Sequence, residues 1–219
     1  MTEEERYEAL KDKKITAPFY EGEADAFIAE ELEGKTNNFA KKAIVTIANK
    51  LGIIGSEINF KDVEVKIVLS NSNLRESLSK KATPEQIAKL LPVLSTTAES
   101  SIVIERHNNR YYYDTDTVYF DSLLGAYIDG DDLIPVRFGL KHSKSGATTL
   151  YVVVDQNKVT LENLDEIKND RGHQDASPTK EESNSLRRSV TYSISQIIPF
   201  VNSKDLLRYL PDGMLTKNQ

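Results

Sequence analysis

The feature that most constrains the fold is a run of four segments between residues 101 and 156 that are rich in β-branched and aromatic residues. Their sequences are SIVIER, TVYFDSLLGAYIDG, DLIPVRFGLKH and TTLYVVVDQ. Such side chains favour strands, which pack them well on a pleated surface. Asp129-Gly130 and Ser145-Gly146 fall between consecutive segments, and both pairs are typical of hairpin turns. The pattern predicts a consecutive antiparallel meander of about four to five strands.

Helical patterns dominate the chain before this run. Residues 3–12 and 22–33 predict short acidic amphipathic helices, separated by ITAPFYEG, and residues 37–52 predict a longer helix that Gly52 ends. Residues 63–70, VEVKIVLS, begin by alternating apolar and polar side chains, which predicts one strand with a buried face. We therefore expect helices that cover the apolar face of the sheet, which is the α+β class.

Residues 71–100 predict two further helices. The second begins at Thr83-Pro84-Glu85-Gln86, where Thr83 is suited to the N-cap, Pro84 to the first helical position and Gln86 to the third. Pro92 lies inside this helical pattern. Because proline cannot donate the helical hydrogen bond, the helix is expected to kink or end near Leu91.

The expected organisation has four parts. Residues 1–60 form a helical N-terminal segment, and residues 61–165 form the α+β core domain. Residues 166–186 are polar and contain Gly, Pro and Ser, which is typical of a flexible linker. Residues 187–219 recover apolar periodicity and are expected to form a C-terminal helical tail.

Composition narrows the functional classes. The chain has no cysteine, which excludes disulfides and cysteine-ligated zinc, and its charged first residues lack the apolar stretch of a signal peptide. Residues 1–34 contain eleven Asp/Glu and four Lys/Arg, a local charge of −7, whereas the whole chain carries −6. The remainder is therefore close to neutral, so the overall charge does not steer the molecule toward nucleic acid.

Residues 105–119, ERHNNRYYYDTDTVY, concentrate side chains that can do chemistry. A metal-independent ribonuclease needs a base for the 2′-hydroxyl, an acid for the leaving oxygen and cations for the charged transition state. Histidine exchanges protons near neutral pH, and arginine binds phosphate in a bidentate manner. His107 and Arg110 are therefore candidate catalytic residues, and Arg106 is a candidate substrate-binding residue.

Segment 133–142 adds two cations. In a regular strand Arg137, Gly139 and Lys141 project from one face, whereas His142 projects from the opposite, apolar face. The Arg137/Lys141 face is either a phosphate clamp beside His107 or an ordinary solvated sheet face. Gly139 either leaves room for a ligand or marks a bulge.

Two other features leave alternatives open. Tyrosines 111–113 suit either packing or base stacking. Asp114, Asp116 and Asp121 offer oxygen ligands for magnesium or calcium, but D-T-D-T-V lacks the D-x-D-x-D-G spacing of a calcium loop. No metal or cofactor is predicted.

The order of segments from 63 to 160 resembles a known group of domains. VEVKIVLSNSNLRESLSKKA is a strand that leads into a helix marked by Ser and Arg; IERHNN follows a second helix, and an I-D-G hairpin, a V-R-F strand and a Y-V-V-V strand come after it. This arrangement resembles small α+β domains of large polyvalent proteins from phages and conjugative elements, and of phage head-morphogenesis fusion proteins. Some of these are similar to the barnase–EndoU–colicin–RelE superfamily of ribonucleases. The resemblance implies His107 as acid/base, Arg137 and Lys141 as phosphate contacts, and Arg75 and Ser77 as helix-borne polar residues near the site.

Two functions of different classes are compatible with these features. The first is an RNase-like accessory protein of phage or mobile-element origin that acts on RNA through His107 and the Arg137/Lys141 face. The second is a non-catalytic protein that inhibits a host defence protein, with residues 1–34 imitating nucleic-acid charge. The expected partner is RNA or a host nucleic-acid-binding protein, the expected location is the cytoplasm of a bacterial host, and no membrane contact is expected.

Overall fold

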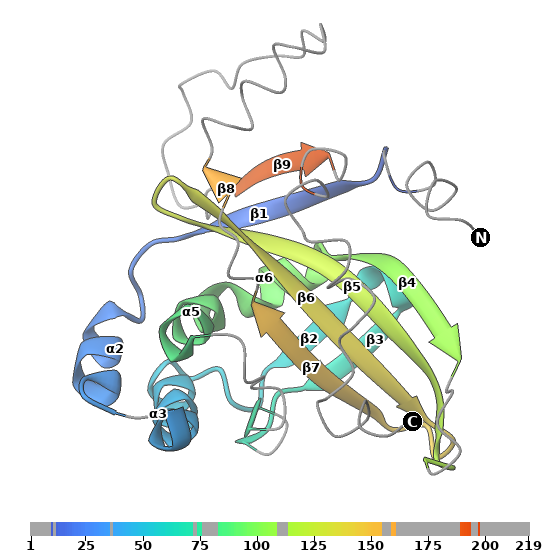
Figure 1. Cartoon of the computed structure of the whole chain (residues 1–219), viewed down its shortest axis with the longest axis horizontal. Coiled ribbons are helices and arrows are strands. Elements are labelled where there is room, and N and C mark those ends of the chain that lie inside the picture. Colours follow the sequence, from blue (N-terminus) through green and yellow to red (C-terminus); the bar gives the residue numbers. More distant parts are fainter. Residues whose placement is uncertain are drawn as a thin grey trace, which may run out of the picture.

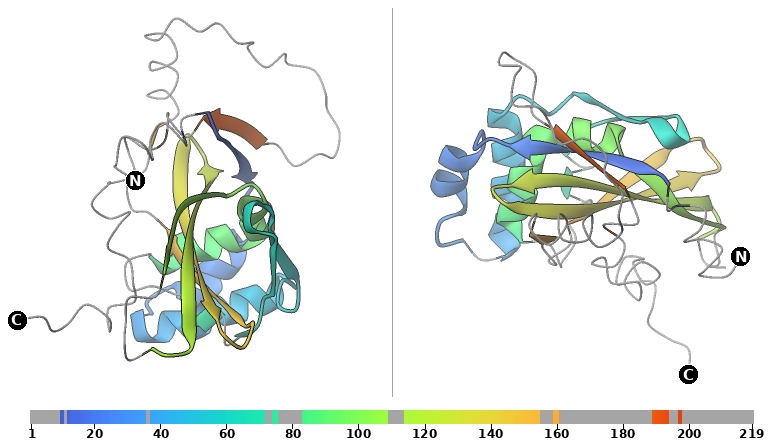
Figure 2. Two further views of the ribbon diagram at one scale, coloured as in Figure 1. Left: turned by 90° about the vertical axis from the view of Figure 1, so that its right-hand side faces the viewer. Right: turned by 90° about the horizontal axis from the view of Figure 1, so that it is seen from above.

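The computed structural model describes residues 10, 12–35, 37–71, 74–75, 83–108, 114–154, 159–160, 189–193 and 197. Helices and a small two-stranded sheet lie together on one side of a large mixed sheet (Figure 1, Figure 2). The fold class is therefore α+β, as the sequence predicts.

The predicted meander is confirmed. It consists of β4 (Ile102–Asn108), β5 (Thr117–Asp129), β6 (Asp132–Ser143) and β7 (Thr148–Val154), and each strand pairs antiparallel with the next. Gly130 and Gly146 lie in the two predicted hairpin turns with φ of 61° and 84°. Such positive angles favour glycine, which has no Cβ to clash with the backbone.

Three strands of the large sheet were not predicted. Strand β1 (Lys14–Tyr20) runs parallel to the end of β5, and β9 (Ser189–Ser193) pairs antiparallel with β1. The short β8 (Val159–Thr160) pairs with β6. The segment 1–60, predicted as helical with a break at ITAPFYEG, therefore contains a strand at that break and a second one at Glu57–Phe60. The prediction of a helical tail from 187 is wrong at 189–193. Residues 166–186, predicted as a linker, lie outside the described residues.

A separate hairpin packs with the helices in the same core. It is formed by β2 (Glu57–Phe60) and β3 (Val65–Val68), which are joined by a 3-10 turn, η1 (Lys61–Val63). Only the second strand was predicted, over 63–70. The alternation is confirmed within β3 itself, where Ile67 is buried and Val68 is exposed.

The helices agree with their predicted positions better than the strands do. They are α2 (Asp25–Leu32), α3 (Asn37–Lys50), α5 (Pro84–Leu90), the 3-10 turn η2 (Leu91–Val93) and α6 (Leu94–Glu99). Thr83 and Gln86 form the predicted capping box, and η2 interrupts the helix at Pro92 as expected. Within the described ranges no helix has the length and apolar character needed to span a bilayer.

The large sheet has an apolar cluster on each face. The helix-side core joins the helices and the β2–β3 hairpin to Leu123, Tyr127 and Phe138 of the sheet. The opposite core includes Leu124, Ile128 and residues of β1 and β9, such as Ile15 and Tyr192. Helices α2, α3 and α5 gather at one end of the sheet, so the end at the β6–β7 turn extends beyond them (Figure 1).

Gly125 gives a test of this packing. A Cβ at Gly125 would lie 2.9 Å from the Thr97 carbonyl oxygen and 3.2 Å from Cε2 of Phe138, because α6 approaches β5 closely there. Gly125→Ala should lower the free energy of unfolding by about 1–3 kcal/mol, the usual cost of overpacking. Urea denaturation measures this.

Gly139→Ala is the matched control. A Cβ at Gly139 would meet only Tyr151 atoms, the nearest at 3.5 Å, which is ordinary contact. This variant should change stability by less than about 0.5 kcal/mol. Equal unfolding midpoints for the two variants would contradict the close approach of α6.

Candidate functional site

The register of the meander decides which candidate residues share a face. Arg106 lies opposite Asp121 of β5, whereas the next residue, His107, lies opposite Phe120, which in turn lies opposite Lys141. Residues directly opposite one another project from the same face, and neighbours along a strand project from opposite faces. The structure therefore separates Arg106 from His107, and the expectation that they act together on one ligand is wrong.

The helix-side face carries a charged cluster near the β6–β7 turn. Asp121 is fully buried, with 0% of its surface exposed. Arg106 donates two hydrogen bonds to its carboxylate, one from Nε to Oδ1 and one of 3.0 Å from Nη2 to Oδ2. His142 Nε2 lies 3.1 Å from Oδ2 of the same carboxylate. Asp121 thus joins β4, β5 and β6.

Thr148 and Tyr119 complete this Asp121 cluster. The Thr148 hydroxyl lies 3.3 Å from Nδ1 of His142. The Tyr119 ring stacks on the His142 ring with 4.1 Å between centroids, and the Arg106 guanidinium lies 5.0 Å from the Tyr119 centroid on the exposed side of the cluster. The stack holds the guanidinium and the imidazole at a fixed separation.

The electrostatics of the cluster determine the charge of His142 and which of its ring nitrogens carries the proton. Burial lowers the pKa of His142, and the attraction of Asp121 only partly offsets this effect. His142 is therefore neutral at pH 7. Because an ionised carboxylate accepts hydrogen bonds and cannot donate them, the single N–H of the ring is on Nε2, toward Asp121. Nδ1 is left as an acceptor for the Thr148 hydroxyl.

Arg106 is the accessible member of the cluster. Its side chain is 57% exposed, although Asp121 beneath it is fully buried. The hydrogen bonds to Asp121 raise the pKa of Arg106 still further, so the guanidinium is charged at any relevant pH. A cation held in place by a buried partner and open to solvent is suited to binding an anion such as phosphate.

The opposite face holds the other predicted site residues. His107 stacks on Phe120 with 5.2 Å between ring centroids, and its Nδ1 is buried without a hydrogen-bond partner among the described residues. Two strand spacings separate His107 from Lys141, which is about 10 Å. Lys141 Nζ binds Asp114 Oδ2 at 2.8 Å, and this hydrogen bond lowers the pKa of Asp114 to about 2.

The predicted phosphate clamp is not open. Arg137 shares a face with Lys141, as predicted, but only 8% of its surface is exposed. The sheet shows no bulge at Gly139; it pairs regularly with Ser122 and Tyr151. Arg75 is exposed in the chain after β3, and Arg110 and Ser77 lie outside the described residues. Among the described residues, no group of His, Asp and Glu could hold a metal ion.

Sequence reasoning placed His142 on the core-facing side of β6 correctly but gave it no role. Asp121 was considered only as a metal ligand, and Thr148 was not considered. The signal was an aspartate at a core-facing position of an otherwise apolar strand, YFDSLL. A buried carboxylate requires a cationic or hydrogen-bonding partner, and the predicted hairpin pairing places His142 next to it.

Comparison with protein family models, with curated proteins and with solved structures finds no match to this chain.

Asp121 should be essential to stability. In Asp121→Ala the Arg106 guanidinium turns to solvent, but the Nε2–H of His142 is left buried without an acceptor. We expect the free energy of unfolding to fall by about 2–4 kcal/mol, between the loss of a buried hydrogen bond and the loss of a buried ion pair. Urea denaturation measures it, with the exposed Asp116→Ala as control. A change of Asp121→Ala no larger than that of the control would contradict the buried pairing.

The lowered pKa of His142 predicts a pH dependence of stability. Below the ordinary histidine pKa of 6.5, the unfolded chain binds a proton that the folded chain resists, so stability decreases as the pH falls. This contribution is complete above pH 6.5 and is lost as the pH falls toward the folded pKa, by up to about 1.4 kcal/mol per pH unit. His142→Gln should flatten the dependence between pH 7.5 and 5.5 in urea denaturation, whereas His107→Gln serves as the control for removal of an imidazole. Parallel profiles for wild type and His142→Gln would refute the burial argument.

Proposed function

We propose that the chain cleaves RNA by metal-independent acid/base chemistry, as an accessory protein of the phage or mobile-element kind that its sequence resembles, and that the Asp121 cluster is the active site. One observation carries the proposal: a fully buried carboxylate binds a half-exposed guanidinium and a neutral imidazole side by side. The reaction is the one expected from the sequence, but the acid/base role moves from His107 to His142.

His142 has a nitrogen suited to proton transfer. In the proposed reaction Nδ1 accepts the proton of the 2′-hydroxyl while O2′ forms a bond to phosphorus and the bond from phosphorus to O5′ breaks. The imidazolium then gives the proton to O5′, which leaves a 2′,3′-cyclic phosphate and a free 5′-hydroxyl. The contact between Nδ1 and the Thr148 hydroxyl supports this role, because it indicates that Nδ1 accepts from a hydroxyl group.

Arg106 is suited to binding the phosphate at the RNA bond that is cleaved. A guanidinium has five N–H groups, and Asp121 accepts from two of them, so three remain for the non-bridging oxygens. Such donors stabilise the charge that develops in the transition state without moving. Asp121 has a positioning role, since it holds both the guanidinium and the Nε2–H of His142.

The test is RNA cleavage by the purified full chain. Total RNA and a fluorescent oligoribonucleotide are incubated with the protein at pH 5 to 9, with EDTA or with magnesium. We expect cleavage that EDTA does not abolish and products that end in 2′,3′-cyclic phosphate. His142→Ala should lower the rate by at least about 100-fold, the usual contribution of a general acid/base, and Arg106→Gln by a similar factor.

His107→Ala is the matched control, since it removes an imidazole from the opposite face of the same sheet. Its rate should stay within about threefold of wild type, and circular dichroism verifies that each variant is folded. Loss of cleavage in His107→Ala but not in His142→Ala would return the acid/base role to His107. A wild-type chain that cleaves no RNA under any of these conditions would overturn the proposal and leave the non-catalytic inhibitor as the remaining hypothesis.

A further inference from the structure

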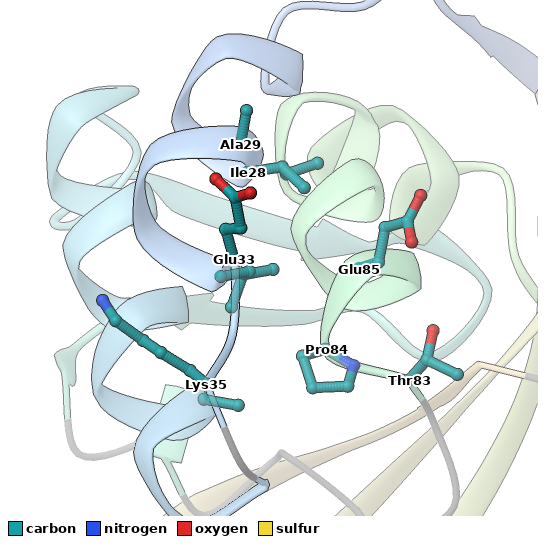
Figure 3. Close-up of a pocket in the computed structure, with 9 residues that line it drawn as sticks. Ile28, Ala29, Glu33, Lys35, Thr83, Pro84 and Glu85 are labelled. Carbon is teal, nitrogen blue, oxygen red and sulfur yellow. The ribbon is translucent and has the colours of Figure 1, made fainter.

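A pocket of about 530 Å³ lies among α2, α3 and α5, at the end of the molecule away from the Asp121 cluster (Figure 1, Figure 3). About half of its lining is apolar, from residues that include Ile28, Leu32, Ala40 and Pro84, and the other half is polar. Glu33 and Glu85 stand on opposite sides of it (Figure 3). The volume falls within the range of about 300–1,000 Å³ that is typical of ligand sites.

An exposed aromatic side chain is the chain neighbour of one of the lining residues. Phe39, the residue before Ala40 in α3, is 63% exposed, the highest value among the large hydrophobic side chains of the described residues. A small molecule that filled the pocket would leave Phe39 in water. A polypeptide segment that entered the pocket with one side chain would be long enough to cover Phe39 as well, and an exposed large apolar side chain is a common feature of protein-binding sites.

The charges around the pocket indicate which kind of partner can bind there. Glu33 has no ion-pair partner among the described residues, and Glu85 is 62% exposed at 3.5 Å from Lys89, which lies closer to Asp129. Lys35, the one cation among the described residues that line the pocket, is bound to Glu31 at 3.3 Å. The rim is therefore negative, which repels the phosphates of nucleic acid and attracts lysine and arginine.

We propose that this pocket is a docking site for a protein partner, which inserts one aliphatic or aromatic side chain between α2 and α5 and places a flanking lysine or arginine against Glu33 and Glu85. The apolar anchor supplies burial, and the acidic rim supplies specificity and speeds association. The site shares no residue with the Asp121 cluster, so docking is independent of the proposed RNA cleavage.

The test selects binders from a display library of random twelve-residue peptides against the immobilised full chain. Synthetic copies of the enriched peptides are then measured by fluorescence anisotropy. We expect the enriched peptides to share an apolar residue with a lysine or arginine within four positions. Their Kd should increase at least tenfold for Glu33→Lys/Glu85→Lys and at least threefold for Phe39→Ser.

Asp12→Lys/Asp131→Lys is the control, because it changes the net charge equally at exposed positions that do not line the pocket. Its Kd should stay within about threefold of wild type. Three outcomes would overturn the proposal: enriched peptides without a basic residue, equal weakening by the two charge reversals, or displacement of the peptide by an equimolar RNA oligonucleotide. None of them depends on whether the chain cleaves RNA, so the two proposals can fail separately.

Discussion

The pairing of β5 with β6 is the interaction on which the rest of the structure depends. It runs from Thr117↔Ser143 to Asp129↔Asp132, and each apolar cluster is built on residues of this pair. The segment 123–128 of β5 is buried throughout, because its side chains enter the helix-side core on one face and, on the other face, the apolar cluster that they share with residues of β1 and β9. A strand covered on both faces is a continuous apolar run, and LLGAYI has this form.

Near the β6–β7 turn, the paired residues of β5 and β6 lie outside the apolar clusters, and polar side chains become frequent. Asp121 is at this transition and is still completely buried. Leaving a carboxylate there without partners would cost several kcal/mol, so the fold itself requires Arg106 and His142 beside it. The cluster that we propose for catalysis is thus also a structural element. Arg106 has both roles, because its guanidinium binds the buried carboxylate and is also half exposed to solvent.

Local signals predicted most of the fold. The hairpin turns, the capping box at Thr83 and the break at Pro92 each depend on residues that are neighbours in the chain. Strand β1 depends on a parallel partner more than one hundred residues away, and ITAPFY contains a proline that is unusual in strands. Pro18 is tolerated because it pairs with Ser189 at the end of the β9 ladder. No local pattern predicts that pairing.

Of the residues in the candidate site, only Arg106 was among the predicted site residues. Period-two alternation was applied to β6, where it placed Arg137 and Lys141 on one face and His142 on the other. It was not applied to Arg106 and His107, which are neighbours on β4 and therefore lie on opposite faces. Clustering along the sequence was mistaken for clustering in space. The ion pairs of Arg106 with Asp121 and of Lys141 with Asp114 depend on tertiary distances that the sequence does not contain.

The charge distribution connects the two proposed sites. The acidic excess is confined to residues 1–34, which include α2 and the Glu33 side of the pocket, whereas the remaining chain is close to neutral. A negative potential at the helical end disfavours the approach of RNA from that side and leaves the β6–β7 end, with Arg106, as the more favourable one. The same potential attracts a basic protein segment to the pocket. One uneven distribution of charge would thus direct the two proposed ligands, which are of opposite sign, to opposite ends of the molecule, and salt should weaken both effects.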